Sequence, residues 1–300
     1  MKYLVTGGAG FIGSTLVDTL IEANHEVIVL DNLSTGNDMH VNSDATLHVA
    51  DISHPGSNIK QYMTGVDTVF HLAALARVQP SIKHPERFNK TNVDGTLHVL
   101  TAARDANVRR VVYSASSSAY GDATVFPTPE DHPTDPLSPY GLQKLIGEQY
   151  CKVFHHCYGL ETVSLRYFNV YGERQSLDGA YKLVMGIFAD QRLRQQPLTI
   201  TGDGEQRRDF TYVGDVVRAN ILAAHSELVG SGESINIGNG DNRSVNRIAD
   251  LIGGTREYID SRLAPRQTLA DNTKAVELLG WRSTVTVEEW IPQYKKQLGI

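Results

Sequence analysis

The sequence has little cysteine and no long apolar run. Its two cysteines, Cys151 and Cys157, lie six residues apart on one expected helix, a spacing that suits neither a disulfide nor a metal site. No apolar segment approaches the roughly 20 residues that a membrane-spanning helix needs. The chain begins directly with a strand, so no secretory signal is expected. We therefore expect a cytoplasmic protein with free thiols, no metal site and no membrane partner.

An excess of basic residues is also lacking. The formal net charge is −6 at pH 7, which disfavours a nucleic-acid-binding surface. Hydrophobic residues make up 41% of the chain and charged residues 21%, which is ordinary for a globular enzyme. A chain of 300 residues can hold one large domain or two modest ones, so a sizeable core is expected.

Three glycines near the start follow an apolar strand expected over residues 2–5. Gly7, Gly10 and Gly13 precede a helical pattern of apolar residues. A backbone without side chains can approach a pyrophosphate closely, and a helix N-terminus offers free N–H groups and a partial positive charge. A tight strand-to-helix turn could explain the glycines alone, but their place between strand and helix favours dinucleotide binding.

Asp31 indicates which dinucleotide is bound. It ends a second apolar strand, expected over residues 26–30. A carboxylate at this point can accept hydrogen bonds from both ribose hydroxyls of adenosine and would repel a 2′-phosphate. We therefore predict NAD, and not NADP, as the cofactor.

Apolar strands alternate with longer helical segments through the first half of the chain. This alternation predicts an α/β fold with a Rossmann-type, doubly wound parallel sheet whose ligands lie at the carboxyl ends of the strands. After about residue 170 the pattern is more irregular, which indicates a smaller mixed α/β lobe. We expect an NAD-binding domain over 1–166, to which part of 211–240 returns, and a substrate-binding lobe over 167–210 and 241–300. Strands are expected at 2–5, 26–30, 46–49, 67–70, 110–114 and 162–166, and helices near 86–106, 139–157, 181–195, 213–227, 244–252 and 272–279.

Tyr140 and Lys144 lie one turn apart on a helix that begins after Pro139, so their side chains share one face. Lys144 could lower the pKa of Tyr140 and reach the nicotinamide ribose, and a phenol tuned in this way is a general acid–base. A serine-rich run over 114–118 follows a strand, and we place its Ser116 as the third member. The run could instead form a turn that satisfies its own backbone.

Together these features resemble the NAD-dependent epimerase/dehydratase family of extended short-chain dehydrogenases/reductases, and the resemblance covers essentially the whole chain. Within that family the sequence is most similar to UDP-galactose and UDP-N-acetylglucosamine 4-epimerases. The motifs lie at residues 6–13, 31–36, 51–52, 71–74, 92–96, 140–144, 166–172, 202–204, 208–210 and 269–271. The resemblance implies that the cofactor is bound by Gly7, Gly10, Phe11, Ile12, Gly13, Asp31, Asn32, Ser34, Gly36, Asp51, Ile52, Leu72, Ala73, Ala74, Asn92, Ser114, Tyr140, Lys144 and Tyr167.

The residues after Ser116 indicate the reaction. Dehydratases of the family carry an acidic pair there and decarboxylases carry a Glu, whereas Ser117 and Ser118 follow in this chain. The resemblance therefore implies a 4-epimerase, in which Ser116 holds the 4-hydroxyl of the sugar, Tyr140 exchanges its proton, and a 4-keto sugar turns over before it is reduced. A uronate 4-epimerase, a dehydratase or reductase, and a non-catalytic dinucleotide sensor are the alternatives.

The resemblance also assigns residues to a nucleotide-sugar. Asn169 and Arg208 would contact the diphosphate, and Arg262 fits the second phosphate arginine, because guanidinium groups bind phosphate oxygens bidentately. Leu198 would line the base pocket, although a plain core strand explains it equally well. Thr268 stands where epimerases of unacetylated sugars carry a tyrosine, which predicts room for a 2-acetamido group. The acid that the family carries for the uridine ribose is missing after Arg262, which leaves the base open.

Two further glycines, Gly141 and Gly147, lie on the same expected helix as Tyr140. Small residues permit close helix packing, and related proteins dimerise through this helix and the one near 86–106. We therefore expect a homodimer, although the two glycines could instead pack within one subunit.

Overall fold

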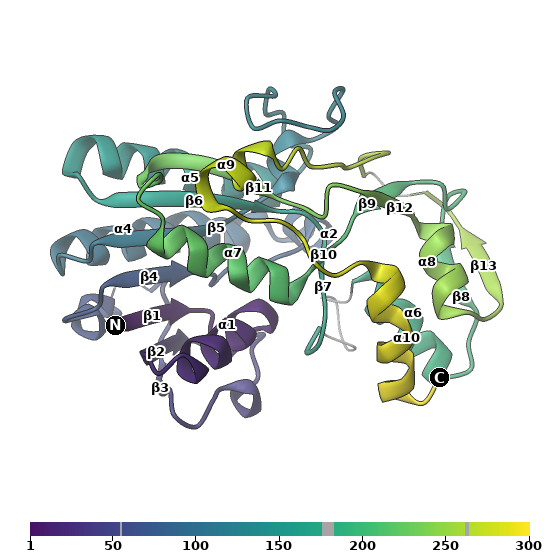
Figure 1. Ribbon diagram of the computed structural model, residues 1–300, viewed down its shortest axis with the longest axis horizontal. Helices are drawn as coiled ribbons and strands as arrows, with labels where there is room; N and C mark the ends of the chain where they lie inside the picture. Colours follow the sequence, from purple (N-terminus) through teal and green to yellow (C-terminus); the bar gives the residue numbers. More distant parts are fainter. Residues whose placement is uncertain (55, 176–182, 262–263) are drawn as a thin grey trace.

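A seven-stranded sheet lies at the centre of the protein, whose computed structural model describes residues 1–54, 56–175, 183–261 and 264–300. The strand order is β11-β6-β5-β4-β1-β2-β3, and every neighbouring pair is parallel. The strands are β1 (Lys2–Thr6), β2 (Glu26–Asp31), β3 (Thr46–Val49), β4 (Thr68–His71), β5 (Arg110–Ser116), β6 (Glu161–Tyr167) and β11 (Ser231–Ile237). The sheet confirms the predicted Rossmann-type α/β fold (Figure 1).

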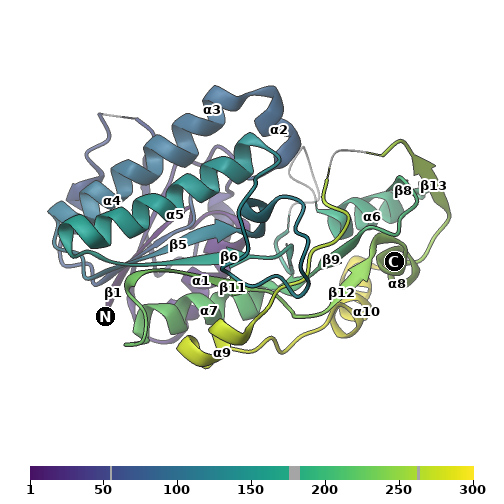
Figure 2. The same ribbon diagram turned by 90° about the horizontal axis from the view of Figure 1, so that it is seen from above.

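Helices cover both faces of this sheet (Figure 2). The strands are buried on both sides, as in β4, where all four residues are buried. One layer contains α1 (Phe11–Glu22), α7 (Val213–His225) and α9 (Thr273–Leu279), and its hydrophobic core includes Leu16 and Val216. The other contains α3 (Pro85–Asn89), the π-helical turn η3 (Lys90–Asp94), α4 (Gly95–Asp105) and α5 (Pro139–Tyr158), and its core includes Val99 and Phe154.

Helix α5 shows why its sequence folds as it does. Ser138 caps its N-terminus by accepting a hydrogen bond from the Gly141 N–H at 3.1 Å, and Pro139 occupies the first turn. Gly159, at a φ of 69°, ends the helix in the left-handed conformation that glycine adopts most easily. Tyr140 is therefore fixed in the first turn, where α5 meets the carboxyl ends of the strands.

A smaller mixed lobe packs beside the sheet and has its own hydrophobic core, which includes Phe188, Ile248 and Trp290. Its strands form three pairs, which are β8 with β13, β9 with β12, and β7 with β10. Its elements are β7 (Val170–Tyr171), α6 (Val184–Leu193), β8 (Leu198–Thr201), β9 (Arg207–Asp209), β10 (Thr211–Tyr212), β12 (Asn242–Ser244), α8 (Val245–Ile252), β13 (Arg256–Ile259) and α10 (Val287–Leu298). Between β10 and β12 the chain runs through α7 and β11 and so returns to the large sheet.

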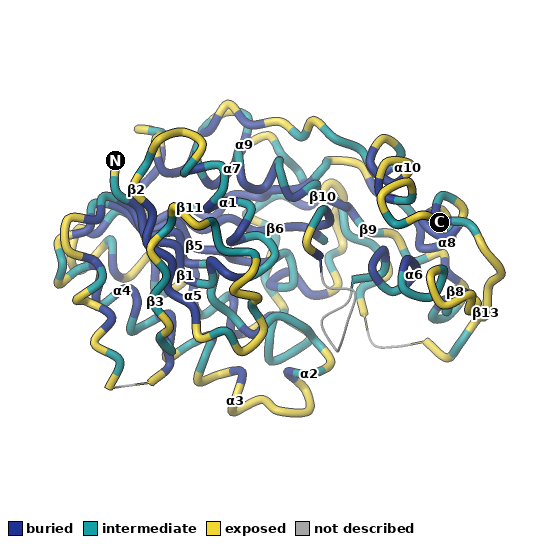
Figure 3. Tube along the Cα trace, turned by 90° about the horizontal axis from the view of Figure 1, so that it is seen from below, coloured by how far each residue is buried: buried dark blue, intermediate teal, exposed yellow. Residues whose placement is uncertain are grey.

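The elements differ from the sequence predictions in a few places. The helix expected near 86–106 is divided into α3, η3 and α4, and two helices were not predicted, α2 (Val78–Lys83) and α10. Both thiols are free, and Cys151 is buried whereas Cys157 is exposed. No helix in the described ranges is long and apolar enough to cross a membrane. Buried residues are concentrated in the strands of the sheet, and exposed residues run along α3 and the outer loops (Figure 3).

Candidate active site

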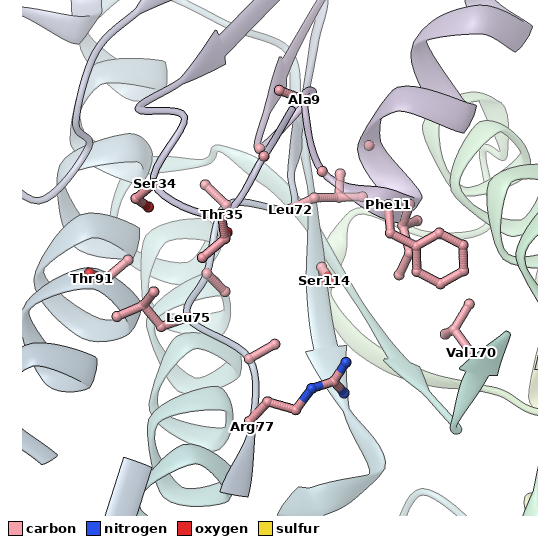
Figure 4. A pocket seen from close by; sticks show the side chains of 18 of the residues that line it. Ala9, Phe11, Ser34, Thr35, Leu72, Leu75, Arg77, Thr91, Ser114 and Val170 are labelled. Carbon is pink, nitrogen blue, oxygen red and sulfur yellow. The ribbon is translucent and has the colours of Figure 1, made fainter. Parts of the chain in front are cut away.

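A cavity of about 1550 Å³ opens at the carboxyl ends of the central strands. It extends from the turn between β1 and α1, past the ends of β2, β4 and β5, to the start of α5 and the beginning of the smaller lobe (Figure 4). All the predicted cofactor residues except Asn92 line it, as do Ser116, Ser117, Ser118 and Asn169. The structure thus brings together residues that are 162 positions apart in the sequence, from Gly7 to Asn169.

The turn between β1 and α1 leaves no room for side chains. Gly7 has a φ of 72°, and a Cβ there would lie 2.7 Å from the backbone nitrogen of Ala73. A Cβ at Gly13 would overlap the carbonyl oxygen of Gly7. Gly10 stands at the N-cap without a side chain to cap α1. The first amide N–H groups of a helix have no acceptor within it, so they are available to an anion in the cavity.

Two carboxylates stand at the ends of β2 and β3. Asp31 is 8% exposed, and its two oxygens accept hydrogen bonds from the N–H groups of Ala9 at 3.0 Å and Leu33 at 2.8 Å. Asp51 accepts hydrogen bonds from Asn32 Nδ2 at 3.2 Å and from Ser53 N at 2.8 Å. These bonds fix both carboxylates. Each oxygen of Asp31 keeps a free lone pair, whereas Asp51 Oδ1 also accepts a hydrogen bond from the Ser53 hydroxyl at 2.7 Å.

Tyr140 and Ser116 come together at the inner end of the cavity. Burial raises the pKa of Tyr140, while a hydrogen bond with Ser116 and the positive charge of Arg77 act in the opposite direction. Ser116 also accepts a hydrogen bond from the Ser118 N–H at 3.1 Å and donates one to the Ser118 hydroxyl at 3.1 Å. The serine-rich run therefore forms the satisfied turn that the sequence offered as an alternative, and it still presents Ser116 to Tyr140.

Lys144 is almost fully buried one turn below Tyr140. Its Nζ donates a hydrogen bond to the carbonyl oxygen of Ser114 at 2.6 Å and lies 5.0 Å from the centre of the Tyr113 ring. Burial lowers the pKa of Lys144 to about 8. The structure does not show the expected lowering of the Tyr140 pKa by Lys144, because the ammonium group is directed to the end of β5.

Asn92 supports the cavity wall from behind and does not line it. Its side chain accepts a hydrogen bond from the Leu75 N–H at 2.9 Å and donates to the Leu75 carbonyl at 3.0 Å and to Gln143 Oε1 at 3.0 Å. With its amide used in this way, Asn92 holds the loop after β4 against α5. A contact between Asn92 and the cofactor stays a prediction.

The predicted substrate residues lie in several places. Asn169 lines the cavity, and its Nδ2 donates to Thr268 Oγ1 at 3.2 Å, so Thr268 stands behind Asn169 and outside the cavity lining. Arg208 is half-buried near this point, outside the lining, and burial lowers the pKa of its guanidinium with no described carboxylate to offset this. Leu198 is fully buried in the core of the smaller lobe, as a plain core strand requires. Arg262 lies outside the described residues.

Several lining residues were not assigned from the sequence. Arg77 and Gln175 face the cavity from loops, and Tyr294 faces it from α10. Loops and a terminal helix carry no periodic signal that ties them to a site, so only the three-dimensional structure reveals these contacts. Gly141 and Gly147 pack within the subunit, because Cβ atoms there would meet the Ser118 carbonyl oxygen and the Tyr113 hydroxyl.

Comparison with known proteins places this geometry in context. A family model described as the NAD dependent epimerase/dehydratase family matches residues 3–238. A protein of Methanocaldococcus jannaschii named a putative UDP-glucose 4-epimerase is 42% identical over 295 residues, which cover 96% of this chain and 95% of that protein. Both comparisons extend well beyond the glycine-rich turn.

Two solved structures agree closely with the whole fold. The UDP-glucose 4-epimerase of Thermotoga maritima, solved with UDP-glucose, has a TM-score of 0.93 at 40% identity and covers 99% of this chain and 100% of its own. The UDP-N-acetylglucosamine 4-epimerase of Methanobrevibacter ruminantium, solved with UDP-N-acetylmuramic acid, has a TM-score of 0.91 at 35% identity, with 99% and 98% covered.

Proposed function

The chain belongs to the NAD-dependent epimerase/dehydratase family, and from this premise we propose that it is an NAD-dependent UDP-sugar 4-epimerase. The observation that carries the proposal is the catalytic cluster, in which Tyr140, Ser116, Ser117 and Ser118 line one cavity with the glycine-rich turn. No carboxylate follows Ser116. The site can therefore exchange a proton at a sugar hydroxyl, and the two positions after Ser116 carry no acid that would expel water.

The lining residues fit NAD. The first amide groups of α1 would hold the pyrophosphate, Asp31 the adenosine ribose and Lys144 the nicotinamide ribose. The absent side chains at Gly7 and Gly13 leave the space that such a ligand needs. When bound, NAD⁺ supplies the oxidant for carbon 4 of the sugar and is regenerated when that carbon is reduced again.

The protein's own residues move the proton and hold the sugar. Ser116 orients the 4-hydroxyl, and Tyr140 accepts its proton as carbon 4 becomes a ketone. The 4-keto sugar then presents its other face, and Tyr140 returns the proton to the oxygen. Hydroxyl groups can both donate and accept hydrogen bonds, so the pair of Ser116 and Tyr140 suits a proton transfer that runs in both directions.

We propose that the diphosphate is anchored by Asn169 and Arg208, with Arg262 as the second arginine. Asn169 faces the cavity, and the charge of Arg208 is offset by no described carboxylate, which favours an anionic partner. The sugar in this proposal is glucose or galactose and extends to their 2-acetamido forms, because Thr268 is small and the likeness to a UDP-N-acetylglucosamine 4-epimerase extends over 99% of the chain. A uronate substrate is the alternative.

A homodimer through α5 is a further part of the proposal. Leu142, Ile146 and Val153 recur at helical spacing on α5, and Leu142 and Val153 are 48% and 49% exposed. An apolar stripe of this kind favours helix packing against a second copy. Sedimentation of wild type and of Leu142→Asp tests it: the proposal predicts a dimer that the aspartate dissociates, and a monomeric wild type contradicts it.

The function is tested with a panel of substrates. The purified protein is incubated with UDP-glucose, UDP-N-acetylglucosamine and UDP-glucuronate without added cofactor, and the sugar products are followed by NMR. The proposal predicts the 4-epimer of at least one substrate, with Tyr140→Phe as the inactive control. A product that has lost water, or no product from any member of the panel, would contradict it.

A further inference from the structure

Arg77 has a backbone conformation that non-glycine residues rarely adopt. Its φ is 150° and its ψ is 136°, immediately before α2. Residues held in such strained conformations concentrate at functional sites, because the surrounding structure must stabilise them at a cost. Here the strained backbone directs the Arg77 side chain into the cavity below Ser114 (Figure 4).

The position of Arg77 is coupled to that of Tyr140 by a direct contact between their helices. The hydroxyl of Ser81 on α2 accepts a hydrogen bond from the Tyr140 N–H at 3.1 Å and donates one to the Val78 carbonyl at 2.7 Å. Arg77 is the residue that precedes α2, so this contact fixes both the base of its side chain and the start of α5. Its Nε is shielded from solvent, which strengthens the field of the guanidinium.

The other titratable groups near Tyr140 are turned elsewhere or are neutral. Lys144, one turn below, donates a hydrogen bond to the Ser114 carbonyl at 2.6 Å, so its ammonium group lies at the end of β5. Tyr113 and Tyr167 lie on the adjacent strands, and burial raises the pKa of both, which keeps them neutral. The positive charge of Arg77 acts against burial and lowers the pKa of the Tyr140 phenol, as does the hydrogen bond with Ser116.

We propose that Arg77 is a positioning residue for proton transfer, whose guanidinium stabilises the Tyr140 phenolate and so lets it accept the proton of the sugar hydroxyl. The inference rests on the proposed function and deepens it, because it concerns the same step. In that step the O–H bond of the sugar breaks, the O–H bond of Tyr140 forms, and Arg77 keeps all its protons. A guanidinium suits this role because it stays charged throughout the working pH range.

The test is a direct titration of Tyr140 in the purified, cofactor-containing protein. Ultraviolet difference spectra between each variant and the same variant carrying Tyr140→Phe isolate this one phenol from the other tyrosines. We expect Arg77→Met to raise the midpoint of the Tyr140 titration by about one pH unit, because a nearby opposite charge has been removed. Arg77→Lys should stay close to wild type. Arg77→Gly removes the charge but tolerates the strained φ, so it should match Arg77→Met even if the methionine variant folds poorly.

Lys83→Met is the matched control, because it removes an exposed positive charge from the same short helix. Its midpoint should equal that of wild type. The proposal would be overturned if the Tyr140 titration midpoint of Arg77→Gly equalled that of Lys83→Met. It would also be overturned if the midpoint of Arg77→Lys were raised as much as that of Arg77→Met. The titration requires no turnover, so an inactive wild type would contradict the proposed function without deciding this inference. With an active enzyme, the pKa on the acidic limb of the kcat–pH profile should rise by the same amount in Arg77→Met and Arg77→Gly.

Discussion

At the scale of single residues, the site depends on hydroxyl groups whose directions are fixed by the backbone. Ser116 ends β5, and the Ser118 N–H donates to its oxygen at 3.1 Å, so the first turn of η4 (Ser117–Tyr120) sets where the hydroxyl points. Tyr140 is held from the other side by the Ser81 hydroxyl. Both contacts are made by backbone N–H groups, those of Ser118 and Tyr140, which favours accurate positioning for proton transfer.

Tyr140→Phe should lower kcat by about 10²- to 10⁴-fold, because a general acid–base contributes in that range. The affinity for the UDP-sugar should change little, since the ring remains. Tyr158→Phe removes a hydroxyl from an exposed ring on the same helix and should leave the rate unchanged. Ser116→Ala should lower the rate less, and Ser118→Ala less again. Near-normal turnover by Tyr140→Phe would refute the assignment.

Thr268→Tyr should reduce activity on acetamido sugars and spare the unacetylated hexose. The Thr268 hydroxyl bonds both Asn169 Nδ2 and the Asp209 N–H at 3.2 Å, so a larger ring must push Asn169 toward the cavity. Overpacking of this kind costs about 1–3 kcal/mol, and we expect it to weaken the binding of the bulkier acetamido sugar. Steady-state kinetics on both UDP-sugars give the answer, and an equal loss on both would remove Thr268 as the gate.

At the scale of elements, the turn that opens α1 has no tolerance for added atoms. Gly13→Ala would place a Cβ onto the carbonyl oxygen of Gly7, and that backbone cannot yield without moving β1. The variant should lose bound NAD and unfold more easily by about 1–3 kcal/mol. Thr15→Ala, at a half-buried position of the same helix, should stay within about 0.5 kcal/mol. Cofactor content and chemical denaturation measure both, and an NAD-replete, equally stable Gly13→Ala would be inconsistent with this packing.

Helices whose ends carry clear capping residues were predictable from the sequence, and helices without such residues were not. Ser138, Pro139 and Gly159 mark both ends of α5, and the observed bounds agree with the prediction to about one residue. Helix α2 spans six residues around a proline, so no helical periodicity can be seen in it. Helix α10 did carry a signal, the capping box formed by Thr286 and Glu289, which the sequence analysis did not use.

At the scale of the whole molecule, one buried carboxylate ties the two lobes together. Asp209 of β9 accepts hydrogen bonds from the N–H groups of Asn239 at 2.6 Å, Gly240 at 3.1 Å and Ala270 at 2.9 Å. The first two follow β11 of the large sheet, and the third belongs to the segment beside Thr268. These segments are far apart in the sequence, and only the folded structure shows that all of them contact the Asp209 side chain.

Asp209→Ala should destabilise the protein by more than about 3 kcal/mol, because three backbone donors lose their acceptor in the interior. Asp203→Ala removes the same side chain six residues earlier, where the partner is Arg266 and both side chains are more than half exposed. That exposed pair should contribute little to stability, because water and salt screen it. Thermal unfolding of the two variants compares them, and similar losses would show that Asp209 is not a structural tie.

The convergence of remote segments also explains which site residues were predictable from the sequence. The glycine-rich turn, Asp31 and the Tyr140–Lys144 pair are local patterns with a physical cause, and all of them line the cavity. Asn92 and Thr268 are neighbours of the site in space, but their hydrogen bonds are made to Leu75, Gln143, Asn169 and Asp209. A motif can bring a residue to the site, but whether it faces the cavity or supports its wall depends on partners from remote segments.

The central claim is that the sugar is oxidised and reduced again at carbon 4 on one enzyme molecule. It is tested most directly with a UDP-hexose that carries deuterium on carbon 4, incubated without added NAD and followed by NMR and mass spectrometry. The account predicts that the 4-epimer forms over many turnovers and keeps its deuterium at carbon 4. Loss of the deuterium to solvent, or conversion that stops after a single turnover, would contradict it.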